Sequence, residues 1–313
     1  MQTPPPKLVL VLSENWTLVP PRDLRALVRI AVEAEEAGVD GVMVSEHVVL
    51  GPGADAGGLP PNPREYALPG NQDPATPWPS SLLLLSAIAA ATTRLRLIAG
   101  AVIAPLRHPL LLAKELATLD LLAEGRLVVQ PTVSWHRAEY EALGVPFEAR
   151  GELLDEHLAA WDVLWRETPA SFEGSRYRFS DVYFEPKPWW GGGPGLWFGG
   201  STLHDRLVRR IVRYGHGFNP LGLPRPEDLE RLEAAMLEAG RDPSELELVG
   251  GTRAVFPDAT SVADLGQALE SIPAQLAQGF TTFCFKPSQF ADDPRQVGPL
   301  CREVVARVAR LAS

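Results

Sequence analysis

A histidine that could do acid–base chemistry follows directly on a short apolar run, at Ser45-Glu46-His47 after Val39–Val44. Imidazole titrates near neutral pH, so it can donate a proton to a substrate or accept one from it. If the run is a strand of a parallel barrel, His47 lies at the carboxyl end of that strand, where such folds place their active sites. The alternative is a structural histidine that caps a loop, since the chain contains six histidines.

A second candidate is the turn Gly199-Gly200-Ser201-Thr202, between an apolar run and a helical stretch. Glycines let the backbone approach a phosphate, and the free N–H groups and dipole of a helix N-terminus favour an anion. Ser201 or Thr202 can cap the helix and also donate to phosphate oxygens. The same residues also suit a simple strand-to-helix turn, and both interpretations stay open.

Small residues mark the end of another apolar run, at Ala99-Gly100-Ala101-Val102. Residues of this size let a flat ring approach the backbone closely. They are equally compatible with a tight corner of a barrel. This segment alone therefore predicts no ligand.

These segments need a framework that brings them together. Short apolar runs, several bounded by Gly, Pro or Asn, alternate with amphipathic stretches, which favours buried parallel strands joined by helices. Eight repeats predict an α/β fold, a closed (β/α)8 TIM barrel rather than an open doubly wound sheet. The runs are Lys7–Leu12, Val39–Val44, Leu95–Ile103, Arg126–Pro131, Leu196–Phe198, Gly215–Phe218, Leu246–Gly250 and Thr281–Phe285.

Helical spacing appears between these runs. Apolar residues from Leu24 to Ala31 follow the i, i+3, i+4, i+7 pattern, and Gly38 ends that stretch. Pro109 opens a second helix that ends before Gly125. Further helices are expected at Thr202–Tyr214, Pro226–Ala239, Val262–Gln278 and Pro294–Ala312.

Two segments interrupt the alternation, at about 48–79 and 168–195, and we interpret them as insertions in one domain that spans residues 1–313. The second contains a predicted hairpin, Phe172–Tyr177 with Tyr183–Pro188. We expect both insertions at the carboxyl face of the barrel, where the loops after the strands build active sites. Long loops in compact domains are more often functional than idle, with loose surface insertions as the alternative.

Composition argues against several classes of protein. The chain has 29 basic and 39 acidic side chains, and the resulting net charge of −10 disfavours binding to nucleic acid or to a membrane surface. No stretch approaches the ~20 apolar residues of a transmembrane helix. Met1–Lys7 lacks the apolar core of a signal peptide, and two cysteines make no disulfide framework. We therefore predict a cytoplasmic protein.

Common metal-binding and nucleophile motifs are absent from the sequence. It contains no His-Glu-x-x-His, no phosphate loop ending in Gly-Lys-Ser/Thr and no Gly-x-Ser-x-Gly. The histidines show no metal-ligand spacing, so we expect no metal. Cys284, in a predicted strand, is interpreted as a packing residue rather than a nucleophile.

Several segments together resemble the luciferase-like monooxygenase superfamily, clearly over residues 7–220 and loosely beyond. Ser45-Glu46-His47-Val48-Val49 resembles its deazaflavin-dependent branch, and Gly199-Gly200-Ser201 resembles its phosphate-contacting turn. The other matching residues are Leu95–Val102, Arg107–Pro109, Leu112–Lys114, Ala117–Asp120, Gly125, Arg126, Trp135, Glu139, Gly144, Phe147, Arg150 and Glu156.

This resemblance implies a barrel that binds FMN or coenzyme F420 at its carboxyl face. Glu46 and His47 would lie beside the cofactor ring in catalytic positions, with His47 as the proton donor or substrate contact. Ala101 and Val102 match the place where relatives carry a bulge, often with a cis non-proline peptide, behind the ring. The turn Gly199–Thr202 would hold the cofactor phosphate. Relatives are usually homodimers.

One departure from the family pattern bears on the pocket. Where relatives usually have Gly-x-Gly-x-Gly-Trp, this chain has Gln130-Pro131-Thr132-Val133-Ser134-Trp135. Side chains at three glycine positions narrow that wall and restrict its backbone. Gln130 and Thr132 could bind the pyrimidine edge of the cofactor. They could instead indicate an altered cofactor pose, or a member of the family that has lost catalysis.

The leading hypothesis is an F420-dependent oxidoreductase that transfers a hydride to or from a small organic substrate, with the redox chemistry supplied by the cofactor. An FMN-dependent two-component monooxygenase and a non-catalytic flavin-binding barrel are the alternatives. Trp135, Trp189 and Trp190 are candidates for the substrate wall, whereas Trp197 is expected in the core.

Overall fold

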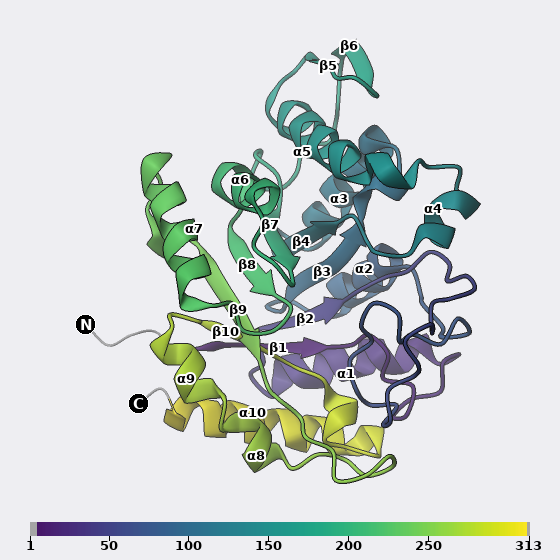
Figure 1. The fold of residues 1–313 in the computed structure, drawn as a ribbon, viewed down its shortest axis with the longest axis vertical. Coiled ribbons are helices and arrows are strands. Elements are labelled where there is room, and N and C mark those ends of the chain that lie inside the picture. Colours follow the sequence, from purple (N-terminus) through teal and green to yellow (C-terminus); the bar gives the residue numbers. More distant parts are fainter. Residues whose placement is uncertain (1–4, 312–313) are drawn as a thin grey trace.

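The computed structural model describes residues 5–311 and shows a closed barrel of parallel strands surrounded by helices (Figure 1). The strand order around the barrel is β1-β2-β3-β4-β7-β8-β9-β10, and β10 pairs with β1 to close it. Each predicted apolar run forms one barrel strand, which confirms the predicted fold. The strands are β1 (Lys7–Val11), β2 (Gly41–Val44), β3 (Arg96–Ile103), β4 (Leu127–Thr132), β7 (Gly195–Gly200), β8 (Gly217–Pro220), β9 (Glu247–Gly251) and β10 (Thr282–Phe285).

Helices connect the strands and cover the outside of the barrel. Ala312, the last residue of a predicted helix, and Met1–Pro4 lie outside the described residues. Within residues 5–311, no helix combines the length and apolar character needed to cross a bilayer. The helices are α1 (Leu24–Glu36), α2 (Ser81–Ala91), α3 (Pro109–Leu122), α4 (Arg137–Ala142), α5 (Arg150–Arg166), α6 (Asp205–Tyr214), α7 (Pro226–Glu238), α8 (Leu265–Leu269), α9 (Ile272–Ala277) and α10 (Val297–Leu311).

Two local predictions are wrong. The single helix expected over Val262–Gln278 is two short ones, because Pro273 lies in the first turn of α9 and a proline cannot donate a hydrogen bond within a longer helix. The hairpin pairs β5 (Ala170–Glu173) with β6 (Arg178–Val182), so its second strand comes earlier than the predicted Tyr183–Pro188. The turn between the two strands is correspondingly shorter.

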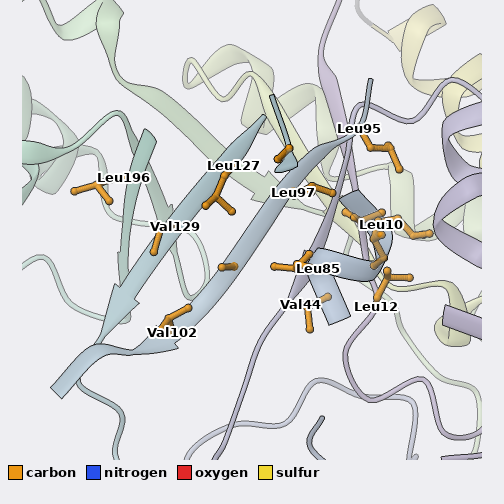
Figure 2. Packing of buried hydrophobic residues seen from close by; sticks show 14 of the residues in the cluster. Leu10, Leu12, Val44, Leu85, Leu95, Leu97, Val102, Leu127, Val129 and Leu196 are labelled. Atoms are coloured by element: carbon orange, nitrogen blue, oxygen red, sulfur yellow. The ribbon is translucent and has the colours of Figure 1, made fainter. Parts of the chain in front are cut away.

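Alternate residues of each strand point to opposite sides of the barrel wall. Leu127 and Val129 of β4 face the helices and belong to the large outer core, together with Leu97 and Val102 of β3 (Figure 2). Val128, between them, belongs instead to a smaller cluster inside the barrel. The wall is thus packed on both of its sides.

The barrel interior is filled at its centre by Trp197, which is 1% exposed and lies among Val9, Ile98 and other apolar residues. The guanidinium carbon of Arg96 lies 5.2 Å from the Trp197 ring centroid, and Arg96 pairs with Glu247 through contacts of 2.7 and 2.8 Å. The predicted core role of Trp197 is confirmed. Cys284 borders the same cluster, and burial raises the pKa of its thiol to about 12, which agrees with a packing role.

Gly217 faces Trp197 on the neighbouring strand, and a β-carbon at this position would overlap the indole. We expect Gly217→Ala to destabilise the fold by about 1–3 kcal/mol, as overpacked cores do. Gly195→Ala is the matched control, since its β-carbon would meet only Val128, at 3.9 Å. Urea unfolding followed by circular dichroism measures both variants. Equal stability of the two would contradict this packing.

Candidate active site

The carboxyl end of the barrel carries polar residues and glycines on its inward-facing positions. These positions continue the inward alternation of the apolar cluster inside the barrel. Ser45 donates to the Ser13 hydroxyl through its backbone N–H at 2.7 Å and through its own hydroxyl at 2.8 Å. The full set is Ser13, Ser45, Gly100, Gln130, Gly199, Asn219, Gly251 and Lys286. The mouth therefore has a polar floor over an apolar interior.

Glu46 lies just after β2, and its carboxylate is saturated by protein donors. One oxygen accepts from the Ile103 backbone N–H at 3.0 Å and from Arg107 at 2.7 Å. The other accepts from the Ser81 hydroxyl at 2.8 Å and from Arg107 at 3.0 Å. Four donors fill the acceptor capacity of a carboxylate. The structure thus favours a positioning role for Glu46 over the predicted catalytic and cofactor-binding ones.

His47 is held by the fully buried carboxylate of Glu139, which comes from α4. Nδ1 of His47 lies 3.2 Å from one carboxylate oxygen, and the other accepts from the backbone N–H of Val48 at 2.5 Å. A carboxylate only accepts, so Nδ1 carries the proton and a neutral ring has Nε2 as its acceptor. Among residues 5–311, Nε2 has no hydrogen-bond partner. The predicted proton-transfer atom is therefore available.

Two tryptophans stand beside the His47 ring. The centroid of the Trp78 ring lies 5.1 Å from that of His47, and the centroid of Trp135 lies 6.1 Å from it, both in edge-on geometry. Trp135 was predicted as a substrate contact and is half-buried at this site. Trp78 was missed, because it lies in the irregular insertion, where no periodicity indicates which side chains turn inward.

The first insertion, residues 48–79, lies at the carboxyl face as predicted and is anchored on two sides. Gly51 donates its backbone N–H to Nε2 of His136, after β4, at 2.7 Å. On the other side, Asn62 donates to the Ser261 carbonyl at 2.8 Å and Arg64 donates to the Thr260 carbonyl at 2.8 Å. The insertion thus links the loop after β4 to the loop after β9.

A cavity of about 400 Å³ lies between the first insertion and the loop after β9. Its lining residues include Asn62, Glu65, Val255 and Asp258.

The second insertion is not at the carboxyl face, which corrects the prediction. It follows α5 and precedes β7, and a helix-to-strand connection begins and ends at the amino end of a barrel. Trp189 donates its backbone N–H to Asp120 at 2.9 Å, and the Trp190 indole donates to the carbonyl of Gly125, just before β4, at 3.4 Å. Both tryptophans are therefore remote from the mouth. They do not form the substrate wall.

The bulge expected from the resemblance is present in β3. Its pairing with β4 shifts register between Gly100 and Val102, and the Gly100–Ala101 peptide is cis. Ala101 is half-buried, whereas Val102 is fully buried in the outer core (Figure 2). Ala101 is therefore available to a ring at the mouth. The predicted cofactor contact through the Val102 side chain is not supported, because that side chain faces the helices.

The residues that replace the family glycines after β4 take distinct roles. Gln130 accepts a hydrogen bond at its amide oxygen from Asn219 of β8 at 2.9 Å. Thr132 is half-buried, and its hydroxyl accepts from the backbone N–H of Ser134 at 3.4 Å. Ser134 has a φ of +58°, a left-handed conformation that glycine adopts more readily. The backbone at Ser134 thus keeps a conformation typical of glycine, while Gln130, Thr132 and Ser134 add side chains to this wall of the pocket.

Gly199 of the predicted phosphate turn serves the protein's own packing. A β-carbon there would lie 2.7 Å from the Gln130 amide nitrogen and 2.5 Å from the Asn219 carbonyl oxygen. The Gln130 side chain therefore lies over Gly199 and covers it. A phosphate at this turn would have to contact residues after Gly199, beginning with Gly200.

The helix after this turn is capped by His204 rather than by Ser201 or Thr202, which corrects that prediction. His204 accepts the Leu207 backbone N–H on Nδ1 at 3.2 Å. Ser201 and Thr202 are both exposed, so their hydroxyls are available to a ligand. Asp205 in the first turn opposes an anion, although its charge is paired with Arg231 at 3.2 Å.

Charged residues beneath the first insertion were not predicted from the sequence. Lys286 is 1% exposed and donates to the Glu65 carbonyl at 3.1 Å, with its nitrogen 5.6 Å from the Tyr66 ring centroid. Burial lowers the pKa of Lys286, and Glu14 partly opposes this. Burial likewise raises the pKa of Glu14, while Lys286 and His47 lower it. A charged residue within three positions of the end of a buried strand, as at Glu14 after β1 and Lys286 after β10, was the signal that could have found both.

Comparison with known proteins gives this arrangement a family. The sequence profile described as luciferase-like monooxygenase matches residues 8–288. The chain belongs to this family. The luciferase-like monooxygenase family agrees with the closed barrel and with the predicted class of redox enzyme.

Curated relatives match about half of the chain and about half of their own length. The FMNH(2)-dependent dimethylsulfone monooxygenase of Pseudomonas putida is 34% identical over 161 residues, covering 50% of this chain and 44% of the relative. An uncharacterized protein of Mycobacterium tuberculosis is 34% identical over 169 residues, covering 53% and 57%. These matches agree with the luciferase-like monooxygenase assignment.

Solved structures support the same fold at low identity. An F420-dependent secondary alcohol dehydrogenase in complex with an F420-acetone adduct superposes with a TM-score of 0.71 at 16% identity, covering 98% and 99% of the two chains. The monooxygenase RslO1 from Streptomyces bottropensis gives 0.67 at 21% identity, covering 97% of each. An F420-dependent dehydrogenase and a monooxygenase therefore share this architecture.

The saturated carboxylate of Glu46 predicts a stability effect. We expect Glu46→Gln to destabilise the fold by about 3 kcal/mol, because it leaves Arg107 without its anionic partner in a largely buried site. Glu148→Gln, in the exposed pair with Arg137, is the control and should have little effect. Urea unfolding compares the two. A Glu46→Gln variant as stable as the control would contradict the positioning role.

The contact between His136 and Gly51 predicts a pH response. Burial lowers the pKa of His136 from 6.5, with Glu139 raising it and His47 lowering it further. As the pH falls, the unfolded chain therefore takes up the proton before the folded protein does. The contact stabilises the folded protein above about pH 6.5, and this stabilisation is lost as the pH falls below that value. Hydrogen exchange should show residues 48–79 less protected at pH 5.5 than at 7.5. His136→Asn keeps an acceptor that cannot be protonated, and it should reduce that difference; an unchanged response would refute this role.

Proposed function

We propose that the chain is an F420-dependent oxidoreductase that moves a hydride to or from a small organic substrate, with His47 transferring the accompanying proton. The observation that supports this most directly is the pairing of Nδ1 of His47 with the buried Glu139, which leaves Nε2 without a hydrogen-bond partner among the described residues. His47 stands next to Glu46, whose carboxylate accepts the Ile103 N–H, so the histidine and the β3 bulge are linked.

The residues at the mouth fit such a cofactor. The half-buried Ala101 offers a small surface for a flat ring, and Gln130 with Asn219 offers uncharged hydrogen-bonding groups beside it. Ser201 and Thr202 are exposed at the rim and can donate hydroxyl hydrogens to a phosphate. When bound, the deazaflavin would supply the hydride chemistry, while the protein provides orientation and a proton.

The protein's own contribution follows from three features. Glu139 fixes the orientation of the His47 ring, so Nε2 can give or take a proton at one defined place. The insertion over the mouth limits access of water to the reacting atoms. Trp135 is placed to contact the substrate, because it lies edge-on to His47 and is only half-buried.

A second candidate is an FMN-dependent two-component monooxygenase. It is favoured by the 34% identity, over 161 residues, to the FMNH(2)-dependent dimethylsulfone monooxygenase. The site described above suits either cofactor, because both carry the same pyrimidine edge and a phosphate.

We also retain a homodimer as a proposal. Leu83 of α2 is 74% exposed and Leu111 of α3 is 65% exposed. Large apolar side chains on packed neighbouring helices are typical of an interface.

Titration of the purified protein distinguishes the two cofactors. We expect coenzyme F420 to bind with a micromolar dissociation constant, and FMN to bind more weakly. Tight binding of FMN without binding of F420 would replace the first proposal by the second. Fluorescence and absorbance titrations measure both.

The role of His47 is tested by turnover across a panel of small alcohols and carbonyl compounds with F420. His47→Ala should bind the cofactor but lower kcat by about 100-fold or more, as loss of a general acid or base does. His108→Asn is the control, because His108 is exposed and caps α3, a position that asparagine also suits. Undiminished turnover of His47→Ala would refute the proposed proton transfer.

A further inference from the structure

Gln130 and Asn219 form an amide pair that bridges three strands at the barrel mouth. Gln130 is on β4 and Asn219 is on β8, and β7 lies between these strands. The Asn219 amide nitrogen donates to the Gln130 amide oxygen at 2.9 Å. The bridge passes over Gly199 of β7, where a β-carbon would come within 2.7 Å of the Gln130 amide nitrogen. The glycine is thus needed for the two amides to meet.

This pair leaves one donor group and one acceptor group unused. A primary amide has an NH₂ group with two donors and an oxygen with two lone pairs. Among the described residues, the Gln130 nitrogen and the Asn219 side-chain oxygen have no hydrogen-bond partner, and both side chains are half-buried. Reversing both amides would present the same two kinds of group. The mouth therefore offers a neighbouring donor and acceptor in either orientation.

A donor beside an acceptor selects among ligand groups. Phosphate and carboxylate only accept hydrogen bonds, so either would leave the Asn219 oxygen facing another acceptor, which is unfavourable. A ring edge with N–H next to C=O satisfies both groups at once. The amide pair is thus suited to a cyclic imide or lactam and unsuited to an anion.

The position of the pair places such an edge next to the bulge. Gln130 is the register partner of Gly100 on β3, and the half-buried Ala101 follows Gly100. A planar ring resting against Ala101 would therefore point one edge toward Gln130. Asn219 would complete the contact from the other side of Gly199.

We propose that Gln130 and Asn219 together recognise the imide edge of the cofactor ring, with one amide donating to a ring carbonyl and the other accepting the ring N–H. This rests on the proposed function, since it requires that a flavin or deazaflavin binds. It assigns a binding role to Asn219 and makes Gly199 a packing residue of the recognition pair. The side chains that replace glycine in this wall are then part of the site.

Binding titrations with ring analogues test this. The probes are FMN and coenzyme F420, each with its derivative methylated at the imide nitrogen, which cannot donate. The wild-type protein should bind the parent ring about tenfold more tightly than the methylated one. Methylation removes one hydrogen bond and leaves the accepting amide oxygen of the protein unpaired. Gln130→Met and Asn219→Ala should each weaken binding of the parent ring, and the double variant should bind the two rings about equally.

Gln267→Met is the control, because Gln267 is exposed on α8. This variant should bind both rings as the wild type does. Thermal melts verify that each variant is folded, and if Gln130→Met fails to fold, Asn219→Ala, which removes the other amide, still tests the pair. If neither cofactor binds to the wild-type protein, the proposed function fails. If a cofactor binds but the wild type does not discriminate against methylation, or the variants bind as it does, the recognition pair alone is refuted.

Discussion

The buried ion pair between Glu46 and Arg107 is the interaction on which the candidate site depends. Its carboxylate also accepts from the Ile103 backbone at the end of β3 and from Ser81 at the start of α2. One side chain therefore sets the end of β2, which presents His47, relative to the end of β3, which carries the bulge. Residues beyond the last strand pairing are held only by local contacts. Without this link, the distance between the ends of β2 and β3 would therefore not be fixed.

The division of the barrel into an apolar interior and a polar mouth gives the site its chemistry. Trp197 and the smaller side chains around it fill the interior, and the next inward positions are serine, glycine, amide or lysine. Polar groups on such a floor are desolvated on one side, so hydrogen bonds to a ligand there are stronger than in water. One of these groups, Lys286, also donates to the carbonyl of Glu65 in the first insertion.

Much of the fold could be predicted from the sequence, because buried parallel strands appear as short apolar runs with sharp boundaries. The helix α2 lacked a comparable signal, since Ser81–Ala91 is apolar on all sides and shows no amphipathic stripe. The wrong face predicted for residues 168–195 has a related cause: the helix α5 before it was not recognised, so the segment was interpreted as following a strand.

The candidate site was predicted only in part. His47 was located from its place after an apolar run and the bulge near Ala101 from family resemblance, and both signals record position along the chain. The saturation of Glu46, the outward side chain of Val102 and the contact between Gln130 and Asn219 depend on which side chains meet across strands. Spacing along the sequence carries no information on such pairings, because 89 residues separate Gln130 from Asn219.

Trp197 also has a consequence for the order of events during turnover. In the part of the chain that the structure describes, the indole and its neighbours fill the centre of the barrel, and Arg96 pairs with Glu247 below them, so these side chains close the barrel axis. A ligand that enters the mouth therefore cannot leave through the centre of the barrel. A product still present would therefore block the next substrate, and product inhibition competitive with substrate is the kinetic pattern of a pocket with a single entrance.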